Sequence, residues 1–320
     1  MKNLLKKNET ISVLLAVGTT ILLLLTSEYF LDPANLESLQ TAIAPYGIIA
    51  IGMMALLISG VFDLSVGSVM CFGGLVTAIC FNAGLSTPVA VLCGVLSGAL
   101  IGLVNGFLVE IAGINALITT IGTQYIVRGA CEVILMGKGK GSYTDFPESF
   151  LQIGRGQFLG MFYMVWVMIV LMIVCQFYLS RTAAGRQLYY IGGNYRAATQ
   201  MGINAKWVRI RTFILSGSLS ALAGVLVTAR SGFANRYTGE GIHMNIIIAC
   251  IIGGGSLAGG QGSVVGAFFG MAFMALMSDA FNLYTIAPQW QSIIVGLILL
   301  VVIAVDGFFS LKKLKKLGKL

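Results

Sequence analysis

The sequence predicts an all-α polytopic membrane protein with about ten transmembrane helices, and three observations lead to this fold class. Of its 320 residues, 57% are apolar and only 10% are charged, whereas a soluble domain carries about 25% charged residues. The mean hydropathy is +0.91. Apolar runs near the length of a membrane span follow one another along most of the chain. An ordinary soluble domain is therefore excluded.

The net charge of +8 is concentrated at a few places. Fourteen of the twenty Lys and Arg residues lie near the N-terminus (Lys2, Lys6, Lys7), in the segment 181–211 or in the tail 310–320. The segment 181–211 contains no Asp or Glu. Because cytoplasmic loops of membrane proteins are rich in Lys and Arg, we expect this segment and both termini on the cytoplasmic side. The tail is expected to meet anionic lipid headgroups in part, and nucleic acid is not an expected partner.

The first half of the chain contains five expected helices. Four of them cover residues 11–30, 43–59, 88–110 and 114–136. The third helix along the chain follows a polar interruption after residue 59 and reaches residue 81. The first run follows lysines but is long enough to span and lacks a small-x-small cleavage site, so we interpret it as an uncleaved helix. The acidic residues between 28 and 46 predict an external elbow on the membrane surface.

Two of these helices have distinctive patterns. Helix 88–110 carries Gly94, Gly98, Gly102 and Gly106, a four-residue spacing that lets a neighbouring helix approach closely. Helix 114–136 is polar, and its Arg128 and Glu132 share one face, so they can form an ion pair. The alternative, that these charges line a pathway, stays open because intramembrane charges commonly face a wet cavity.

The second half repeats this organisation. We expect an external loop over 137–160, helices over 161–179 and 207–228 on either side of the basic segment, and an external loop over 230–241. A short helix over 242–252, a glycine-rich interruption over 253–263, a ninth helix and a helix over 288–305 complete the chain.

An inverted repeat of helices 2–5 and 7–10 is suggested by two similarities. The ninth helix carries a second glycine ladder (Gly262, Gly266, Gly270), which matches the ladder of the fourth helix. The tripeptide Gly-Ser-Val also occurs at both Gly67 and Gly262. Aligning the two halves on this tripeptide gives a different register from the glycine ladders, so the alignment of the repeat stays open. Inverted repeats with glycine-interrupted helices are typical of transporters.

Polar, glycine-rich breaks interrupt the apolar sequence twice. The residues singled out are Asp63, Ser65 and Gly67 in the first break, and Gly253, Gly254, Gly255, Gly259 and Gly260 in the second. Glycine permits the backbone of a discontinuous helix at low cost, so we interpret both as hinges. The stretch 257–261 looks like the LSGGQ signature of ABC ATPases, but the chain lacks a phosphate-binding G-x-x-x-x-G-K-[ST] loop.

Candidate catalytic or metal-binding residues are scarce. His243 is the only histidine, and the six cysteines lie in apolar surroundings without paired spacing. We therefore expect no enzyme activity, no metal and no cofactor in this chain. The carboxylates Asp63, Glu110, Asp279 and Asp306 fall near helix ends, which weighs against an ion-coupled secondary carrier without excluding it. An intramembrane enzyme would need a nucleophile or metal cluster that the sequence does not offer.

The basic segment has the features of a docking element. Asn194 can cap a short helix through Arg196, Ala197 and Ala198, and Gly202 can end it. A short helix with small residues on the inner face of a membrane protein fits the groove of another protein. The segment 181–211 therefore predicts a cytoplasmic partner.

Several motifs together resemble the permease subunits of ABC importers for ribose, xylose, galactose and related sugars. They are Asp63-Leu-Ser-Val-Gly-Ser68, Asn105-Gly106, Gly185-Arg186, Gly192-Gly193-Asn194 with Ala197-Ala198 and Gly202-Ile203, and the stretch 253–262. They are spread over about residues 45–307.

The resemblance implies one transmembrane permease domain over 1–320, in the bacterial cytoplasmic (inner) membrane. It implies that Gly185–Ile203 is a coupling loop of this chain that docks on a separate ATPase subunit, with Arg186, Asn194, Arg196, Ala197, Ala198 and Gly202 as the candidate residues. ATP and Mg would belong to that subunit. A second permease, identical or paralogous, and an extracytoplasmic sugar-binding protein would complete the importer.

The solute itself is left open. Sugar permeases of this group commonly have a Pro-Phe-Ile-Thr-like entry to the fifth helix, where this chain has Asn115-Ala-Leu-Ile-Thr119. Autoinducer-2 and nucleosides are therefore alternative solutes. A neutral polyhydroxylated solute needs hydroxyl and amide groups along its path, and the candidates are Asn105, Asn115, Thr119 and Gln124.

Overall fold

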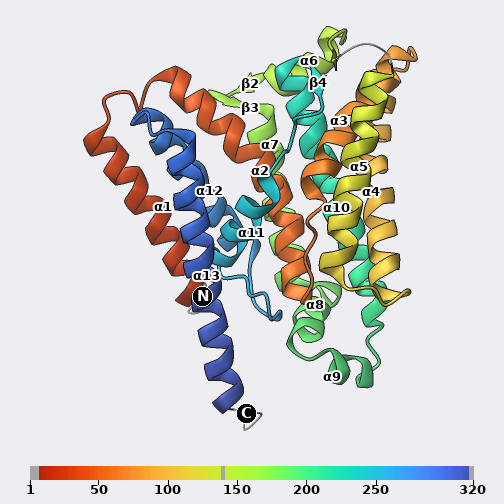
Figure 1. The fold of residues 1–320 in the computed structure, drawn as a ribbon, viewed down its shortest axis with the longest axis vertical. Helices are drawn as coiled ribbons and strands as arrows, with labels where there is room; N and C mark the ends of the chain where they lie inside the picture. Colours follow the sequence, from red (N-terminus) through yellow and green to blue (C-terminus); the bar gives the residue numbers. More distant parts are fainter. Residues whose placement is uncertain (1–6, 138–140, 317–320) are drawn as a thin grey trace.

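The computed structural model describes residues 7–137 and 141–316, and helices form most of it (Figure 1). In chain order the helices are α1 (Lys7–Thr26), α2 (Pro33–Ser59), α3 (Val66–Asn82), α4 (Thr87–Glu110), α5 (Ala116–Met136), α6 (Glu148–Arg155), α7 (Tyr163–Arg181), α8 (Ala183–Gly193), α9 (Tyr195–Gln200), α10 (Ala205–Ser231), α11 (Ile242–Ile252), α12 (Val264–Leu283) and α13 (Pro288–Lys316). The strands are β1 (Ser142–Tyr143), β2 (Gln157–Phe158), β3 (Met161–Phe162) and β4 (Ala234–Asn235).

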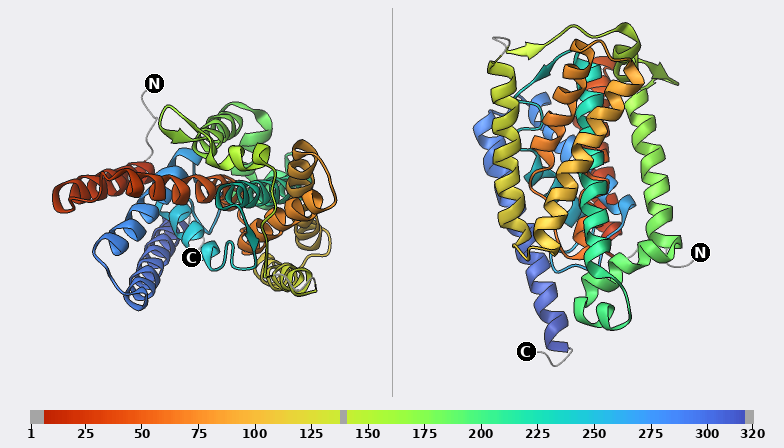
Figure 2. Two further views of the ribbon diagram at one scale, coloured as in Figure 1. Left: turned by 90° about the horizontal axis from the view of Figure 1, so that it is seen from above. Right: turned by 90° about the vertical axis from the view of Figure 1, so that its right-hand side faces the viewer.

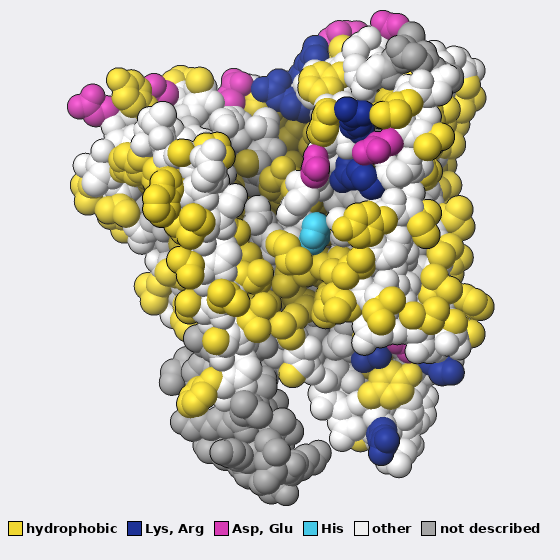
Figure 3. Space-filling view, viewed as in Figure 1, with side chains coloured by type: hydrophobic (Ala, Val, Ile, Leu, Met, Phe, Trp, Pro, Cys, Tyr) yellow, Lys and Arg dark blue, Asp and Glu magenta, His cyan; other side chains and the backbone are white. Residues whose placement is uncertain are grey.

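The helices confirm a polytopic membrane protein. Within the described residues, α2, α4, α7, α10 and α12 have the length and hydropathy of a membrane span, and α1, α3, α11 and α13 contain shorter apolar stretches. Large apolar side chains on the helices are exposed, among them Leu25, Leu100 and Ile126. Apolar side chains cover the middle of the face in Figure 3, and charged ones gather toward its two ends. The count of ten crossings stays a prediction.

Helix α2 is the centre of the bundle. It contacts α7, α8, α10, α11 and α12, and residues 47–59 of it are all buried. The expected elbow is not a separate element, because α2 begins at Pro33 and continues through Pro45 without a break. Its place on the membrane surface stays a prediction. Proline favours the first turn of a helix, which explains the start. The apolar core therefore forms around one long helix.

The glycines of α4 have the packing role that their spacing predicts. A Cβ atom on Gly98 would lie 2.3 Å from the carbonyl oxygen of Gly217, and one on Gly102 would lie 2.3 Å from that of Phe213. Gly217 on α10 meets Gly98 in return. The backbones of α4 and α10 are thus in direct contact, which only glycine allows.

The second ladder is shorter than expected. Gly266 and Gly270 pack against the backbone of Gly253 and Ala249, so α12 lies against α11. Gly262 precedes α12 and has a φ of +138°, so it belongs to the break and not to the ladder.

Helices α3 and α11 are both short and both follow non-helical segments. The segment 60–65 leads from the end of α2 to α3, and the segment 232–241 leads from α10 to α11. Their starts meet, because a Cβ on Gly67 would lie 2.2 Å from the carbonyl oxygen of Gly239 and 3.3 Å from Ile242. This arrangement agrees with a register in which α2–α5 correspond to α10–α13, and the repeat itself stays a prediction.

The two ends of the bundle differ (Figures 1 and 2). The helices α8 and α9 and the last turns of α13 lie at one end, while α6 and the strands lie at the other. The described part of the expected loop 137–160 contains α6, β1 and β2: β1 pairs with β4, and β2 with β3, both antiparallel.

The structure also extends two elements near the basic end. Helix α8 occupies part of the basic segment where only a short helix at 196–201 was expected. Helix α13 continues to Lys316 instead of ending at 305. Residues 317–320 of the expected tail, and Lys2 and Lys6, lie outside the described residues.

Replacing Gly98 with alanine should destabilise the protein, because the added methyl group enters the α4–α10 contact. Overpacking of this kind costs about 1–3 kcal/mol. Gly122 on α5 has nothing within 4 Å of an added Cβ, so Gly122→Ala should be neutral or stabilise by up to about 1 kcal/mol. Thermal unfolding of the purified variants in detergent measures both. Equal stability of the two variants would contradict the packing role of Gly98.

Candidate functional site

The segment after α8 forms the short helix that the sequence predicts. The side-chain oxygen of Asn194 accepts a hydrogen bond from the backbone N–H of Ala197 at 3.0 Å, which caps α9. Gly202 follows α9 with a φ of +82°, a conformation that glycine adopts without strain. Both ends of α9 are therefore set by the predicted residues.

The side chains of α9 face two ways. Ala198 is buried beside Ile191 and Ala205, so it anchors α9 to the chain's own surface. Arg196 and Gln200 are exposed, and Met201 directly after α9 is 73% exposed. Arg186, one of the expected coupling residues, is exposed on α8. The outward surface of α8–α9 is thus basic, with Tyr190 and Met201 as its exposed large hydrophobic side chains.

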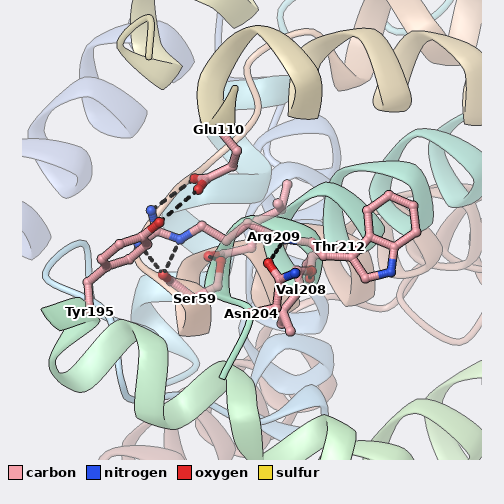
Figure 4. A network of polar contacts seen from close by, with 9 residues as sticks. Ser59, Glu110, Tyr195, Asn204, Val208, Arg209 and Thr212 are labelled. Atoms are coloured by element: carbon pink, nitrogen blue, oxygen red, sulfur yellow. Dashed lines mark hydrogen bonds and ion pairs between the residues drawn. The ribbon is translucent and has the colours of Figure 1, made fainter. Parts of the chain in front are cut away.

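Behind α9, Arg209 joins four separate elements (Figure 4). Its Nε and Nη2 donate to the carbonyl oxygen of Ser59 at 3.0 and 2.7 Å, at the end of α2. Its Nη1 forms an ion pair with Glu110 at the end of α4, at 3.0 Å. The guanidinium lies over the ring of Tyr195, 4.8 Å from its centroid. The hydroxyl of Tyr195 donates to Glu110 at 3.4 Å. We call Ser59, Glu110, Tyr195 and Arg209 the arginine network.

The burial and charges of the arginine network favour keeping its members in contact. The side chains of Glu110 and Arg209 are only 5% and 15% exposed, and a buried charge left without its partner is strongly destabilising. Burial, and then the negative charge of Glu110, raise the pKa of Tyr195 above its ordinary value. The phenol therefore keeps its proton at neutral pH and acts as the donor.

The two glycine-rich breaks meet next to this network. The backbone N–H of Gly260 donates to the carbonyl oxygen of Ile58 at 2.9 Å. A Cβ on Gly192 would lie 1.9 Å from that same oxygen. Gly60 has a φ of +85° and lies beside Gly192 and Gly259. The end of α2, the end of α8 and the second break are therefore in backbone contact.

A buried polar cluster holds the first break. One oxygen of Asp63 accepts from the N–H of Ser65 at 2.8 Å and from its hydroxyl at 2.6 Å. The amide of Asn105 donates to the Ser65 hydroxyl at 3.0 Å, and its oxygen accepts from Thr123 at 2.6 Å. These four side chains tie the start of α3 to α4 and α5. Side-chain groups here supply partners where the helix is interrupted.

The expected path residues have different surroundings, and Asn115 lines a cavity near the end of α4. Asn105 belongs to the buried cluster, and Thr119 is buried on α5. Asn115 caps α5 by accepting from the N–H of Leu117 at 2.8 Å, and Gln124 is half-buried on the same helix. Their role in transport stays a prediction.

The expected ion pair between Arg128 and Glu132 is wrong. Arg128 instead donates to the backbone carbonyls of Arg236 and Thr238, the latter at 2.9 Å. In the described part of the chain, the ion pairs are Arg209–Glu110 and Arg230–Glu37. Arg128 therefore fastens the segment before α11 to α5.

Two cavities lie on either side of the first break. The inner cavity has a volume of about 510 Å³, and its lining includes Gly60, Phe62, Glu110, Tyr195 and Arg209. The outer cavity has a volume of about 600 Å³ and is bounded by Met70 of α3 and by Gly239, which contacts Gly67. The inner cavity therefore borders the start of the segment 60–67, and the outer cavity borders residues next to its end.

Sequence reasoning missed the arginine network. It noted Glu110 as a carboxylate at a helix end and Arg209 as part of the basic segment, but it did not connect them. The two residues are 99 positions apart. One feature of the sequence could have indicated this pair. Glu110 and Arg209 each border an apolar run, and these two ends are expected on the same side of the membrane.

Comparisons with known proteins agree with this architecture. Residues 35–303 match the family model described as the permease component of branched-chain amino acid transport systems. The L-arabinose ABC transporter permease protein AraH of Azospirillum brasilense is 33% identical over 305 residues, which cover 95% of this chain and 88% of the relative. The autoinducer 2 import system permease protein LsrC of Escherichia coli O157:H7 is 34% identical over 313 residues, covering 96% and 89%.

A third relative gives the same result. LsrC of Salmonella choleraesuis is 36% identical over 260 residues, which cover 81% of this chain and 74% of the relative. Because the family model and these relatives span most of the sequence, the chain belongs to the permease-component family of ABC importers.

Proposed function

We propose that this chain forms the translocation path of an ATP-driven importer for a sugar or sugar-like solute. The observation that carries the proposal is the capped helix α9 at the basic end. Its Tyr195 belongs to the arginine network, which reaches the end of α2. Such a connection is what a permease needs in order to respond to an ATPase held on its surface.

The solute class rests on the relatives. One relative is named for L-arabinose and the others for autoinducer 2. We propose a pentose or related sugar as the solute, with autoinducer 2 as the second candidate, because both kinds of permease match nearly the whole chain. The ATPase would supply the alternation between outward and inward forms, while affinity would come from an external binding protein.

The proposed assembly follows the two ends of the molecule. The outward side chains of α8–α9, with Arg186, Arg196 and Met201, would contact the ATPase subunit. The opposite end, with α6 and the strands, would receive the sugar-binding protein. Ten crossings with both termini inside, an inverted repeat and a second permease copy belong to this proposal.

Coupling would run through the arginine network. A displacement of α9 moves Tyr195, which contacts both Arg209 and Glu110. Because Arg209 holds the carbonyl of Ser59, that displacement would act on the end of α2 and on the break that follows it. The inner cavity, which the same residues line, would open or close in response.

The direct test is uptake into proteoliposomes that contain this chain, its ATPase and its binding protein. L-Arabinose, D-ribose and autoinducer 2 are supplied as labelled solutes, with ATP inside. We expect accumulation of at least one, and its loss when the Walker lysine of the ATPase is replaced by alanine. Accumulation through this chain alone, driven by a proton gradient, would instead establish a secondary carrier.

Placing a carboxylate on the docking surface should uncouple the importer. Met201→Asp adds negative charge to an exposed basic surface, so we expect weaker binding of the ATPase and at least about a tenfold loss of uptake. Leu159→Asp is the matched control, because Leu159 is 75% exposed at the opposite end, between β2 and β3. Co-purification of the ATPase is measured for both variants, and uptake is measured for Met201→Asp alone, because Leu159 lies at the end proposed for the sugar-binding protein. Normal uptake by Met201→Asp would exclude this surface as the contact.

Replacing Arg209 with lysine should separate ATP hydrolysis from transport. A single ammonium group cannot bond the Ser59 carbonyl from two nitrogens while also pairing with Glu110. We expect ATP hydrolysis to continue and uptake per ATP to fall roughly tenfold or more, as loss of a charge-assisted hydrogen bond implies.

Arg211→Lys is the control for this variant. Arg211 lies two residues away and stacks on Trp207, with its guanidinium carbon 5.3 Å from the ring centroid. It should keep normal coupling. If both variants transport normally, the arginine network has no role in coupling.

A further inference from the structure

The outer cavity has a lining unlike the rest of the bundle interior. Its wall contains three aromatic rings, several hydroxyl and amide groups and one cation: Thr41, Pro45, Tyr46, Met70, Met164, Val227, Arg230, Ser231, Phe233, Asn235, Tyr237, Thr238 and Gly239. A volume of about 600 Å³ is within the usual range for sites that bind small molecules. Figure 3 shows a hollow in the upper half of the face, between the parts of the molecule that carry α13 and α5.

Polar groups in this wall are left free to bind a ligand. Among the described residues, the Tyr46 hydroxyl has no hydrogen-bond partner, although Tyr46 lies on the buried helix α2. The oxygen of Asn235 accepts bonds from Tyr237 and Thr238, and its NH₂ group donates none within the described chain. Pro45 has no N–H, so the Thr41 carbonyl lacks its usual helical donor. The wall thus offers donors and an acceptor.

The charge of the lining favours a neutral ligand. Arg230 is its one side chain that is charged at neutral pH. Its Nη2 lies 3.4 Å from a carboxylate oxygen of Glu37, and its guanidinium lies over the ring of Phe162, 4.3 Å from the centroid. The positive charge is therefore compensated by groups outside the cavity. A cationic solute would find no opposite charge in this lining, and an anionic solute would have to compete with Glu37 for Arg230.

The wall formed by residues 231–239 is held in place before any ligand arrives. Asn235 accepts from the N–H groups of Tyr237 and Thr238 at 2.8 and 3.0 Å. Strand β4 pairs with β1, and Arg128 donates to two carbonyls of the segment. Since ordering a loop on binding costs free energy, a preformed wall suits recognition of a small solute.

We propose that the outer cavity is a subsite for a neutral polyhydroxylated solute of sugar size, bound by the Tyr46 hydroxyl and the Asn235 amide against the aromatic rings. It rests on the proposed import function and names where the permease itself recognises its solute. Aromatic faces accept the apolar side of a sugar ring, while hydroxyl and amide groups bond its edge.

The first test removes one oxygen atom. Tyr46→Phe keeps the ring, and the lost hydroxyl bonds nothing in the described chain, so a purely structural role predicts no change. In proteoliposomes with the complete importer, we expect kcat/KM for uptake from the sugar-loaded binding protein to fall about fivefold, as loss of one hydrogen bond implies. Tyr29→Phe is the control, because Tyr29 is 65% exposed and follows α1, away from the cavity. An unchanged kcat/KM for Tyr46→Phe counts against the subsite.

The second test measures occupancy without transport. Thr41→Cys, in the permease–ATPase complex without binding protein, is labelled with a membrane-impermeant cationic methanethiosulfonate, and the unsubstituted complex gives the background from native cysteines. We expect L-arabinose or D-ribose at high concentration to slow labelling at least twofold, and gluconate, a charged polyol, to have no effect. Equal labelling with and without both sugars overturns the subsite.

The two proposals can fail separately. ATP-driven uptake of sugar combined with an unaffected Tyr46→Phe variant and no protection at Thr41→Cys overturns the subsite and leaves the import function standing. Protection by neutral sugars without any ATP-driven uptake overturns the import function and supports the subsite. Protection by gluconate as strong as that by the sugars overturns the assignment to a neutral solute.

Discussion

The architecture depends on hydrogen bonds to the backbone carbonyl groups at the end of α2. The last carbonyls of a helix have no partner within it, and a buried end needs one from elsewhere. Arg209 supplies two N–H donors to Ser59, and Gly260 supplies a backbone N–H to Ile58. A cation at the C-terminal end of a helix is also favoured by the helix dipole. The most buried helix is therefore completed by residues from α10 and from the second break.

This constraint explains why the breaks are rich in glycine and in short polar side chains. Where the first break leaves α2, Gly60 takes a left-handed conformation beside Gly192 and Gly259. Farther along, Asp63 and Ser65 bond one another and reach Asn105. Irregular backbone inside a membrane protein persists only where such groups satisfy it. The polar cluster and the arginine network thus stabilise the two ends of one segment.

Local patterns in the sequence predicted the local features well. The spacing of Gly94, Gly98 and Gly102 predicted a face for close helix packing, which lies against α3 and α10, and Asn194 with Gly202 predicted the limits of α9. These features depend on residues within a few turns of one another, so their chemistry can be inferred from spacing alone.

Long-range partners could not be inferred in the same way. The spacing of Arg128 and Glu132 places them on one face, but the carbonyls that Arg128 binds belong to a segment more than a hundred positions away. The acidic residues before Pro45 suggested a separate surface element, whereas packing against α7 and α12 keeps α2 continuous. The outer cavity combines residues of α2, α3, α7 and α10, and no sequence motif predicts it.

Pro45 gives α2 a property that its burial conceals. A proline inside a helix removes one backbone hydrogen bond, and helices bend at such positions. Pro45 separates the outer turns of α2, which carry Thr41, from the inner turns that end at Ser59. The two halves can therefore tilt relative to each other about this hinge. A change in the bend at Pro45 would move Thr41, which lines the outer cavity, relative to the end of α2.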